Sequence, residues 1–156
     1  PNKVAIAAKG GIEAVVRAMA GHASSAEVQE EGCAVLGNLA ENTENQVAIA
    51  VKGGIEAVLG AMASYASRLA MQLTGCYALK NLAMTAENRA AIAAEGGIEA
   101  VVDAMKAHPN VGTMQFFGCW ALNTIASSDS GLRSQVRDAG ALPLVEKVNY
   151  NPNPAP

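Results

Sequence analysis

The five-residue word Gly-Gly-Ile-Glu-Ala occurs three times in this chain, at residues 10–14, 53–57 and 96–100. A second word, Gly-Cys, recurs with the same period, starting at residues 32, 75 and 118. Two markers that share one spacing indicate a tandem repeat, and a period of this size is typical of stacked supersecondary units. Such stacks usually bind partners along an extended face, so the repeat already favours binding over catalysis.

Each repeat is predicted to contain three helices. A short helix ends at a glycine in the left-handed conformation, and a second helix follows at once. A longer third helix comes last and is expected to be capped by Ser24, Ser67 or Asn110, with Ser24 and Glu27 forming a capping box. The turn glycines are Gly10, Gly53, Gly96 and Gly140. The full repeats are residues 2–44, 45–87 and 88–130, and a partial fourth unit covers 131–148.

This arrangement resembles the armadillo repeat, in which a short helix, a turn and two further helices occupy about 42 residues. The segments AGALPLV (139–145) and CYALKNLA (76–83) are the closest matches. The resemblance implies an all-α, right-handed armadillo-like α-solenoid with three full three-helix repeats and a partial fourth. The repeat domain is then 1–148, and the Pro- and Asn-rich residues 149–156 are expected to be a flexible tail.

The composition argues against several protein classes. The formal charge is −3, and the Lys and Arg residues are scattered, so the basic stripe of a nucleic-acid-binding protein is missing. No run of 18 apolar residues occurs, so no membrane span is expected. No Ser-His-Asp or Cys-His arrangement is found, which argues against an enzyme.

The three cysteines occupy one repeat position, so helix packing separates them by about 8–10 Å. That separation is too long for a disulfide or a shared metal, and we expect buried thiols, no metal site and no cofactor. Buried thiols indicate a reducing, intracellular compartment, either cytoplasmic or nuclear.

The third helices carry most of the differences between repeats. Fifteen of 19 positions match between residues 2–20 and 45–63, but only 8 of 17 match between 24–40 and 67–83. At 100° per residue, the variable positions lie opposite the buried stripe. In the armadillo family the third helices line a concave groove that binds partners. The resemblance therefore implies a peptide groove formed by Glu27, Glu30, Asn38, Leu73, Tyr77, Lys80, Asn81, Met84, Phe116, Trp120, Asn123 and Thr124.

The chemistry of this predicted groove changes along the array. Repeat one contributes carboxylates that suit a basic ligand segment, while repeats two and three contribute aromatic and apolar side chains. Layers about 10 Å apart match about three residues of extended chain, so three repeats hold roughly six to nine ligand residues. Nuclear-import members of the family pair a groove Trp with an Asn four residues later. That pair maps incompletely onto Ala34/Asn38, Tyr77/Asn81 and Trp120/Thr124.

Structural alternatives remain open for several groove residues. The aromatic residues of repeat three could pack against the fourth unit, the glutamates could form a solvated helix face, and the asparagines could bond between repeats. The aromatic residues are Phe116, Phe117 and Trp120, the glutamates are Glu30 and Glu31, and the asparagines are Asn38 and Asn81.

We therefore expect a scaffold without catalytic activity that binds a protein or an extended peptide with apolar and basic residues. The alternative is a structural spacer or assembly module that acts through the ends of the solenoid, including an engineered or consensus array. No polar cap follows residue 148, so we expect either a fragment of a longer array or self-association through the uncapped C-terminal end.

Overall fold

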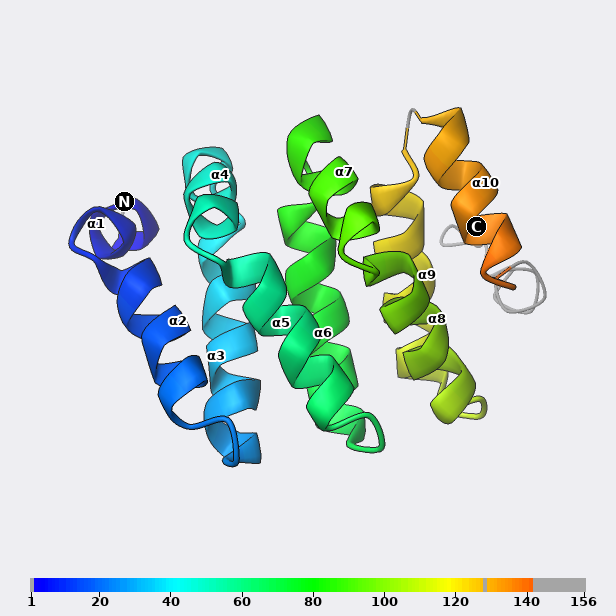
Figure 1. Ribbon diagram of the computed structural model, residues 1–156, viewed down its shortest axis with the longest axis horizontal. Coiled ribbons are helices and arrows are strands. Elements are labelled where there is room, and N and C mark those ends of the chain that lie inside the picture. The colour runs from blue at the N-terminus through cyan, green and yellow to red at the C-terminus, as the bar shows by residue number, and fades with distance from the viewer. Residues whose placement is uncertain (1, 128, 142–156) are drawn as a thin grey trace, which may run out of the picture.

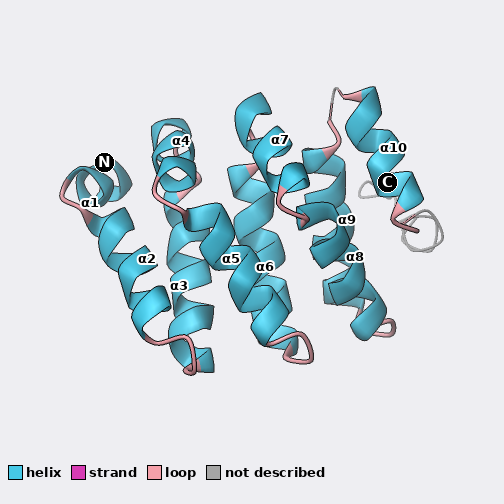
Figure 2. Ribbon diagram, viewed as in Figure 1, coloured by secondary structure: helices cyan, strands magenta, loops and turns pink. Residues whose placement is uncertain are grey.

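The computed structural model describes residues 2–127 and 129–141, and all regular structure in these residues is helical (Figure 2). The ten helices are α1 (Asn2–Ala8), α2 (Gly11–Gly21), α3 (Ala26–Leu39), α4 (Thr43–Val51), α5 (Gly54–Ser64), α6 (Leu69–Leu82), α7 (Ala86–Ala94), α8 (Gly97–Ala107), α9 (Gly112–Ile125) and α10 (Ser130–Asp138).

The helices stack in the order of the sequence (Figure 1). The second helices α2, α5 and α8 form one layer and the third helices α3, α6 and α9 form another, while α1, α4 and α7 lie along one edge. Helix α6 packs against α3 on one side and α9 on the other. The all-α class is confirmed, whereas the right-handed sense and the number of repeats stay predictions.

The four turn glycines adopt the predicted left-handed conformation. Gly53 has φ +82°, and the other three turn glycines lie between +81° and +85°. A side chain at this φ is strained, so glycine allows α5 to start directly after α4. The repeated Gly-Gly word is therefore a structural turn.

The Gly-Cys word marks the contact between the second and third helices of one repeat. A Cβ atom built on Gly75 would lie 2.5 Å from Cγ of Met62, and Met62 is 2% exposed. The same pairing recurs between Gly32 and Met19, and between Gly118 and Met105. Glycine therefore lets the thioether lie directly on the helix backbone, and the adjacent cysteine fills the core.

Buried amide side chains tie the helices of each repeat together. Nε2 of Gln72 donates to the carbonyl oxygens of Met62 (2.9 Å) and Tyr65 (3.0 Å), and Gln29 and Gln115 make the equivalent bonds. Each amide thereby satisfies a carbonyl near the end of a second helix. The other acceptor, the Tyr65 carbonyl in repeat two, also accepts from the backbone amide of Arg68 at 3.0 Å. Between repeats, Nδ2 of Asn88 donates to the carbonyl of Gln46 at 3.0 Å.

The predicted caps of the third helices are wrong by one residue. The N-cap positions are Ser25, Arg68 and Val111 instead of Ser24, Ser67 and Asn110, and only Ser25 accepts a capping bond, from the amide of Val28. The turn already holds its shape through the buried glutamine amides, so a side-chain cap is not needed in every repeat.

Two further expectations concern the limits of the chain. The segment 142–148 of the fourth unit and the expected tail 149–156 lie outside the described residues.

Within the described residues, no single helix is long and apolar enough to cross a membrane. The pair α4 and α5, joined by a 72° bend, passes the same length and composition test only when taken together.

Candidate functional site

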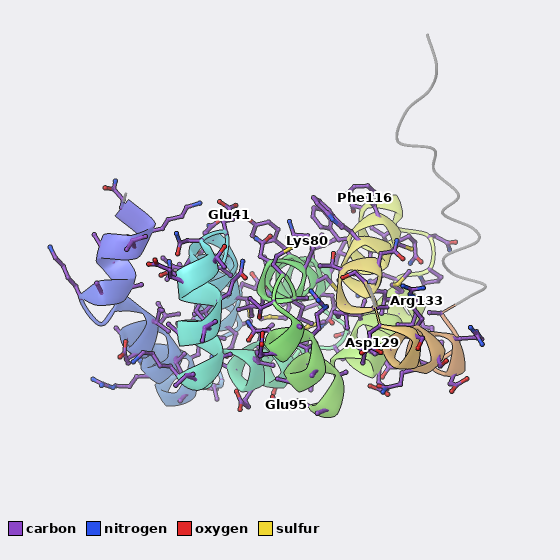
Figure 3. The ribbon with its side chains drawn as sticks, turned by 90° about the horizontal axis from the view of Figure 1, so that it is seen from above. Glu41, Lys80, Glu95, Phe116, Asp129 and Arg133 are labelled. Atoms are coloured by element: carbon purple, nitrogen blue, oxygen red, sulfur yellow. The ribbon has the colours of Figure 1, made fainter. Side chains whose placement is uncertain are left out.

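The candidate site is the face formed by α3, α6 and α9, which we call the third-helix face. Figure 3 shows Glu41, Lys80 and Phe116 along one side of the molecule, with Glu95 on the opposite side. The ridge-like packing of α3 on α6 and α6 on α9 sets the order of these side chains. Residues separated by about 40 positions in sequence thus become neighbours across adjacent helices.

The repeat-one end of this face is acidic but partly paired. Arg68 binds Glu30 through Nε, and its NH2 group lies 3.7 Å from Oε1 of Glu27. The Glu27 side chain is nevertheless 76% exposed, and Glu31 is exposed as well. One arginine thus pairs with two carboxylates, and an incoming basic side chain would compete with Arg68 for them. The pairing of Arg68 was not predicted from the sequence.

Tyr77 of repeat two forms side-chain hydrogen bonds with repeat one. Its hydroxyl donates to Oε1 of Glu41 at 2.6 Å and lies 3.1 Å from Oδ1 of Asn38. The ring lies against Gly37, where an added Cβ would come within 2.8 Å of it. Lys3 and then Tyr77 lower the pKa of Glu41 through hydrogen bonds, so this carboxylate stays charged.

Asn38 and Asn81 occupy equivalent repeat positions but different environments. Asn38 is exposed, and its Oδ1 faces the Tyr77 hydroxyl. Asn81 is 5% exposed, and its Nδ2 donates to the carbonyl of Gly37 at 2.9 Å. Both asparagines therefore form hydrogen bonds between repeats one and two, Asn81 through its amide nitrogen and Asn38 through its amide oxygen.

Lys80 and Trp120 form the contact between repeats two and three. The Lys80 ammonium lies 4.0 Å from the centroid of the Trp120 ring and 5.3 Å from that of Tyr77. Burial lowers the pKa of Lys80, and the charge of Glu41 opposes that shift. The ammonium over the indole is a cation–π contact, which holds the ring in place while leaving part of it exposed.

The repeat-three end of the face is apolar and open. Phe116 is 41% exposed, Trp120 is 44% exposed and Met84 is 61% exposed. The rings of Phe116 and Trp120 meet edge to face, with centroids 5.7 Å apart. Phe117 is half-buried against the core, so packing accounts for Phe117 but not for its two aromatic neighbours. Large apolar groups gathered on a surface mark interaction sites.

A depression of about 430 Å³ lies beside these aromatic rings, and the predicted residues that line it are Lys80, Asn81, Met84, Trp120 and Thr124. Glu41 and Gln46 complete its polar wall. Thr124 donates its hydroxyl to the carbonyl of Trp120, whereas Asn123 is exposed and Leu73 is half-buried. The depression thus brings together five of the predicted residues, and the acidic residues Glu27 and Glu30 lie apart from it.

The remaining reactive groups form no site in the described part of the chain. Cys33, Cys76 and Cys119 are free and buried, and burial raises the pKa of Cys33 and Cys76 to about 12. Such thiols are protonated and poor nucleophiles. Among residues 2–127 and 129–141, no group of three or more His, Cys, Asp or Glu side chains is arranged to hold a metal.

Comparison with known families agrees with this geometry. A family model described as LRRK2 ARM repeat matches residues 9–136. The chain belongs to the armadillo-repeat family. Armadillo repeats are scaffolds that mediate protein–protein interaction and carry no catalytic site of their own. No curated protein and no solved structure matches the chain.

Proposed function

We propose that the third-helix face binds an extended segment of a partner protein. The observation that carries the proposal is the exposure of Phe116, Trp120 and Met84 beside a depression lined by polar groups. Exposed aromatic residues next to a concavity are typical binding anchors, because they bury a large area at a small entropic cost. Apolar ligand side chains would bind here, at repeats two and three.

The polar end of the face sets the second part of the ligand. Glu27 and Glu30 share the single arginine Arg68, and Glu31 is exposed on the same helix, α3. A basic ligand residue would therefore gain electrostatic attraction at repeat one, with an effect that decreases as salt rises. The ligand proposed is a segment of six to nine residues, roughly, with apolar residues at one end and basic residues at the other.

A peptide-array screen followed by titration of the best peptide tests this proposal. Trp120→Ala is expected to weaken that peptide by about 2 kcal/mol, or roughly 30-fold, because Trp120 is a central anchor. Val51→Ala is the matched control, since Val51 is 80% exposed on α4 and lies outside the face. Equal affinity of both variants and the parent chain would remove the third-helix face as the binding surface.

We also propose four further properties of the chain. The chain acts as a scaffold and not as an enzyme. Its buried free thiols support a location in a reducing, intracellular compartment. Its partner is a protein and not a nucleic acid, because the Lys and Arg residues are scattered along the sequence and form no basic stripe. Self-association through the C-terminal end is tested by sedimentation at several concentrations.

A further inference from the structure

A second concave surface lies on the opposite side of the molecule, between α5 and α8. This cleft has a volume of about 410 Å³. Its floor is apolar, with Leu59 and Met62 from α5 and a row of alanines from both helices. Its rim contains Glu95, Glu99 and Asp103. Glu95 lies away from Glu41, Lys80 and Phe116 in Figure 3, so the cleft is separate from the third-helix face.

The preceding pair of repeats supplies an internal comparison for this cleft. Between α2 and α5, Lys52 forms an ion pair with Glu13, and that hydrogen bond lowers the pKa of Glu13. One repeat later, the same two positions hold Glu95 and Glu56. The cation of one interface is thus replaced by a carboxylate in the next.

The substitution leaves Glu95 in unfavourable surroundings. Burial, followed by the charge and contact of Glu56, raises the pKa of Glu95. Gly60 is likewise replaced by Asp103 at the equivalent position, which adds a second new carboxylate to the same rim. Within residues 2–127 and 129–141, no Lys, Arg or His side chain lies within ion-pairing distance of Glu56, Glu95, Glu99 or Asp103.

The apolar floor and the carboxylates are arranged along one direction. Glu99 and Asp103 are four residues apart on α8, which is about 6 Å along the helix axis. Basic side chains at four-residue intervals on a partner helix have the same spacing. An apolar side chain between them would reach Leu59 and the alanines, as one helix packs into the groove between two others.

We propose that the cleft between α5 and α8 binds a basic amphipathic helix of a partner protein. A lysine or arginine of that helix takes the place, beside Glu56 and Glu95, that Lys52 takes beside Glu13 in the preceding interface. The paired carboxylates disfavour the unbound state, and the partner's cation relieves their repulsion. This site is independent of the third-helix face, and a ligand bound to one face leaves the other open.

The probe is a fluorescein-labelled, alanine-based helical peptide of 15 residues with lysines at four-residue intervals and leucines beside them. Binding is measured by fluorescence anisotropy at low and high salt. The parent chain is expected to bind this peptide and to bind its lysine-to-glutamate version at least tenfold more weakly. Affinity is expected to fall as salt rises, since the attraction is between exposed charges.

Two charge reversals with the same net effect decide the location. Glu95→Lys recreates the Lys52–Glu13 pairing with Glu56, so it should keep the fold and weaken the peptide about tenfold or more. Glu87→Lys changes the net charge equally on an exposed position of α7 outside the cleft, and it should change the affinity less than twofold. Circular dichroism melting of Glu95→Lys confirms that loss of binding is not loss of folding.

Four outcomes would overturn the proposal. The parent chain does not bind the lysine peptide, or Glu95→Lys binds it as tightly as the parent does. Alternatively, Glu87→Lys weakens it as much as Glu95→Lys, which would show nonspecific attraction to the net charge. Retained affinity for the glutamate peptide would contradict the proposed charge complementarity in the same way.

Discussion

Two glycine-to-alanine substitutions within repeat two should differ in their effect on stability. Gly60 is an exposed residue inside α5, and a Cβ added to it meets no atom within 4 Å. Alanine is favoured over glycine in a helix interior by about 1 kcal/mol, so Gly60→Ala should stabilise the chain by about that amount. Gly75 is also inside a helix, α6, and its replacement gains the same propensity term.

At Gly75 the gain is opposed by a steric cost. The new Cβ would lie 2.5 Å from Cγ and 2.6 Å from Sδ of Met62, so this buried side chain would have to shift. Overpacking of this kind costs about 1–3 kcal/mol. The free energy of unfolding of Gly75→Ala should therefore be lower than that of Gly60→Ala by about 1–3 kcal/mol. Each kcal/mol of this difference should lower the melting temperature by about 2–4 °C.

Chemical denaturation followed by circular dichroism measures this difference. Met62→Ala supplies a second check, because it removes the side chain that meets the new Cβ. In the Gly75→Ala background, Met62→Ala should cost about 1–2 kcal/mol less than in the parent chain, where losing a buried Met costs about 2–5 kcal/mol. Equal stability of Gly60→Ala and Gly75→Ala would refute the close contact between the second and third helices.

Three further predictions concern ionisation and local stability. The raised pKa of Glu95 means that the folded state binds this proton more tightly than the unfolded state, so its contribution to stability falls as pH rises through the folded-state pKa. Glu95→Gln should therefore gain stability over the parent chain as pH rises from about 4 to 7, and a pH-independent difference in urea titrations would contradict this. Cys33 and Cys76, with pKa values of about 12, should resist a thiol reagent at pH 8 until the chain unfolds; stoichiometric labelling of the native protein would contradict their burial. Helix α1 contains no buried residue whereas α4 contains three, so amide exchange should be faster in α1 than in α4, and equal rates would count against the burial pattern.

Periodicity was sufficient to predict most of the fold. Two words with one spacing predicted the helix triplets α1–α3, α4–α6 and α7–α9 of the described residues, because glycine at φ near +82° is needed where a first helix meets a second. The variable side of the third helix was found in the same way, by comparing repeats. The caps were misplaced because buried Gln72 and its equivalents hold the turn, a role visible only as an identical polar residue in each repeat.

The pairings across the third-helix face could not be predicted from single helices. Arg68 reaches Glu27 and Glu30, and Lys80 reaches Trp120, because adjacent helices are offset along their axes. One signal for this offset was present in the sequence. Gly37 lacks a side chain in repeat one, and Tyr77 of the next repeat fills the space that it leaves.

The fluorescence of Trp120 tests the central claim most directly, since it is the single tryptophan in the chain and is 44% exposed at the apolar end of the third-helix face. The best peptide from the array should shift its emission to shorter wavelength, with a midpoint equal to the dissociation constant measured by anisotropy. A peptide that binds without changing this emission would show that the partner uses another surface.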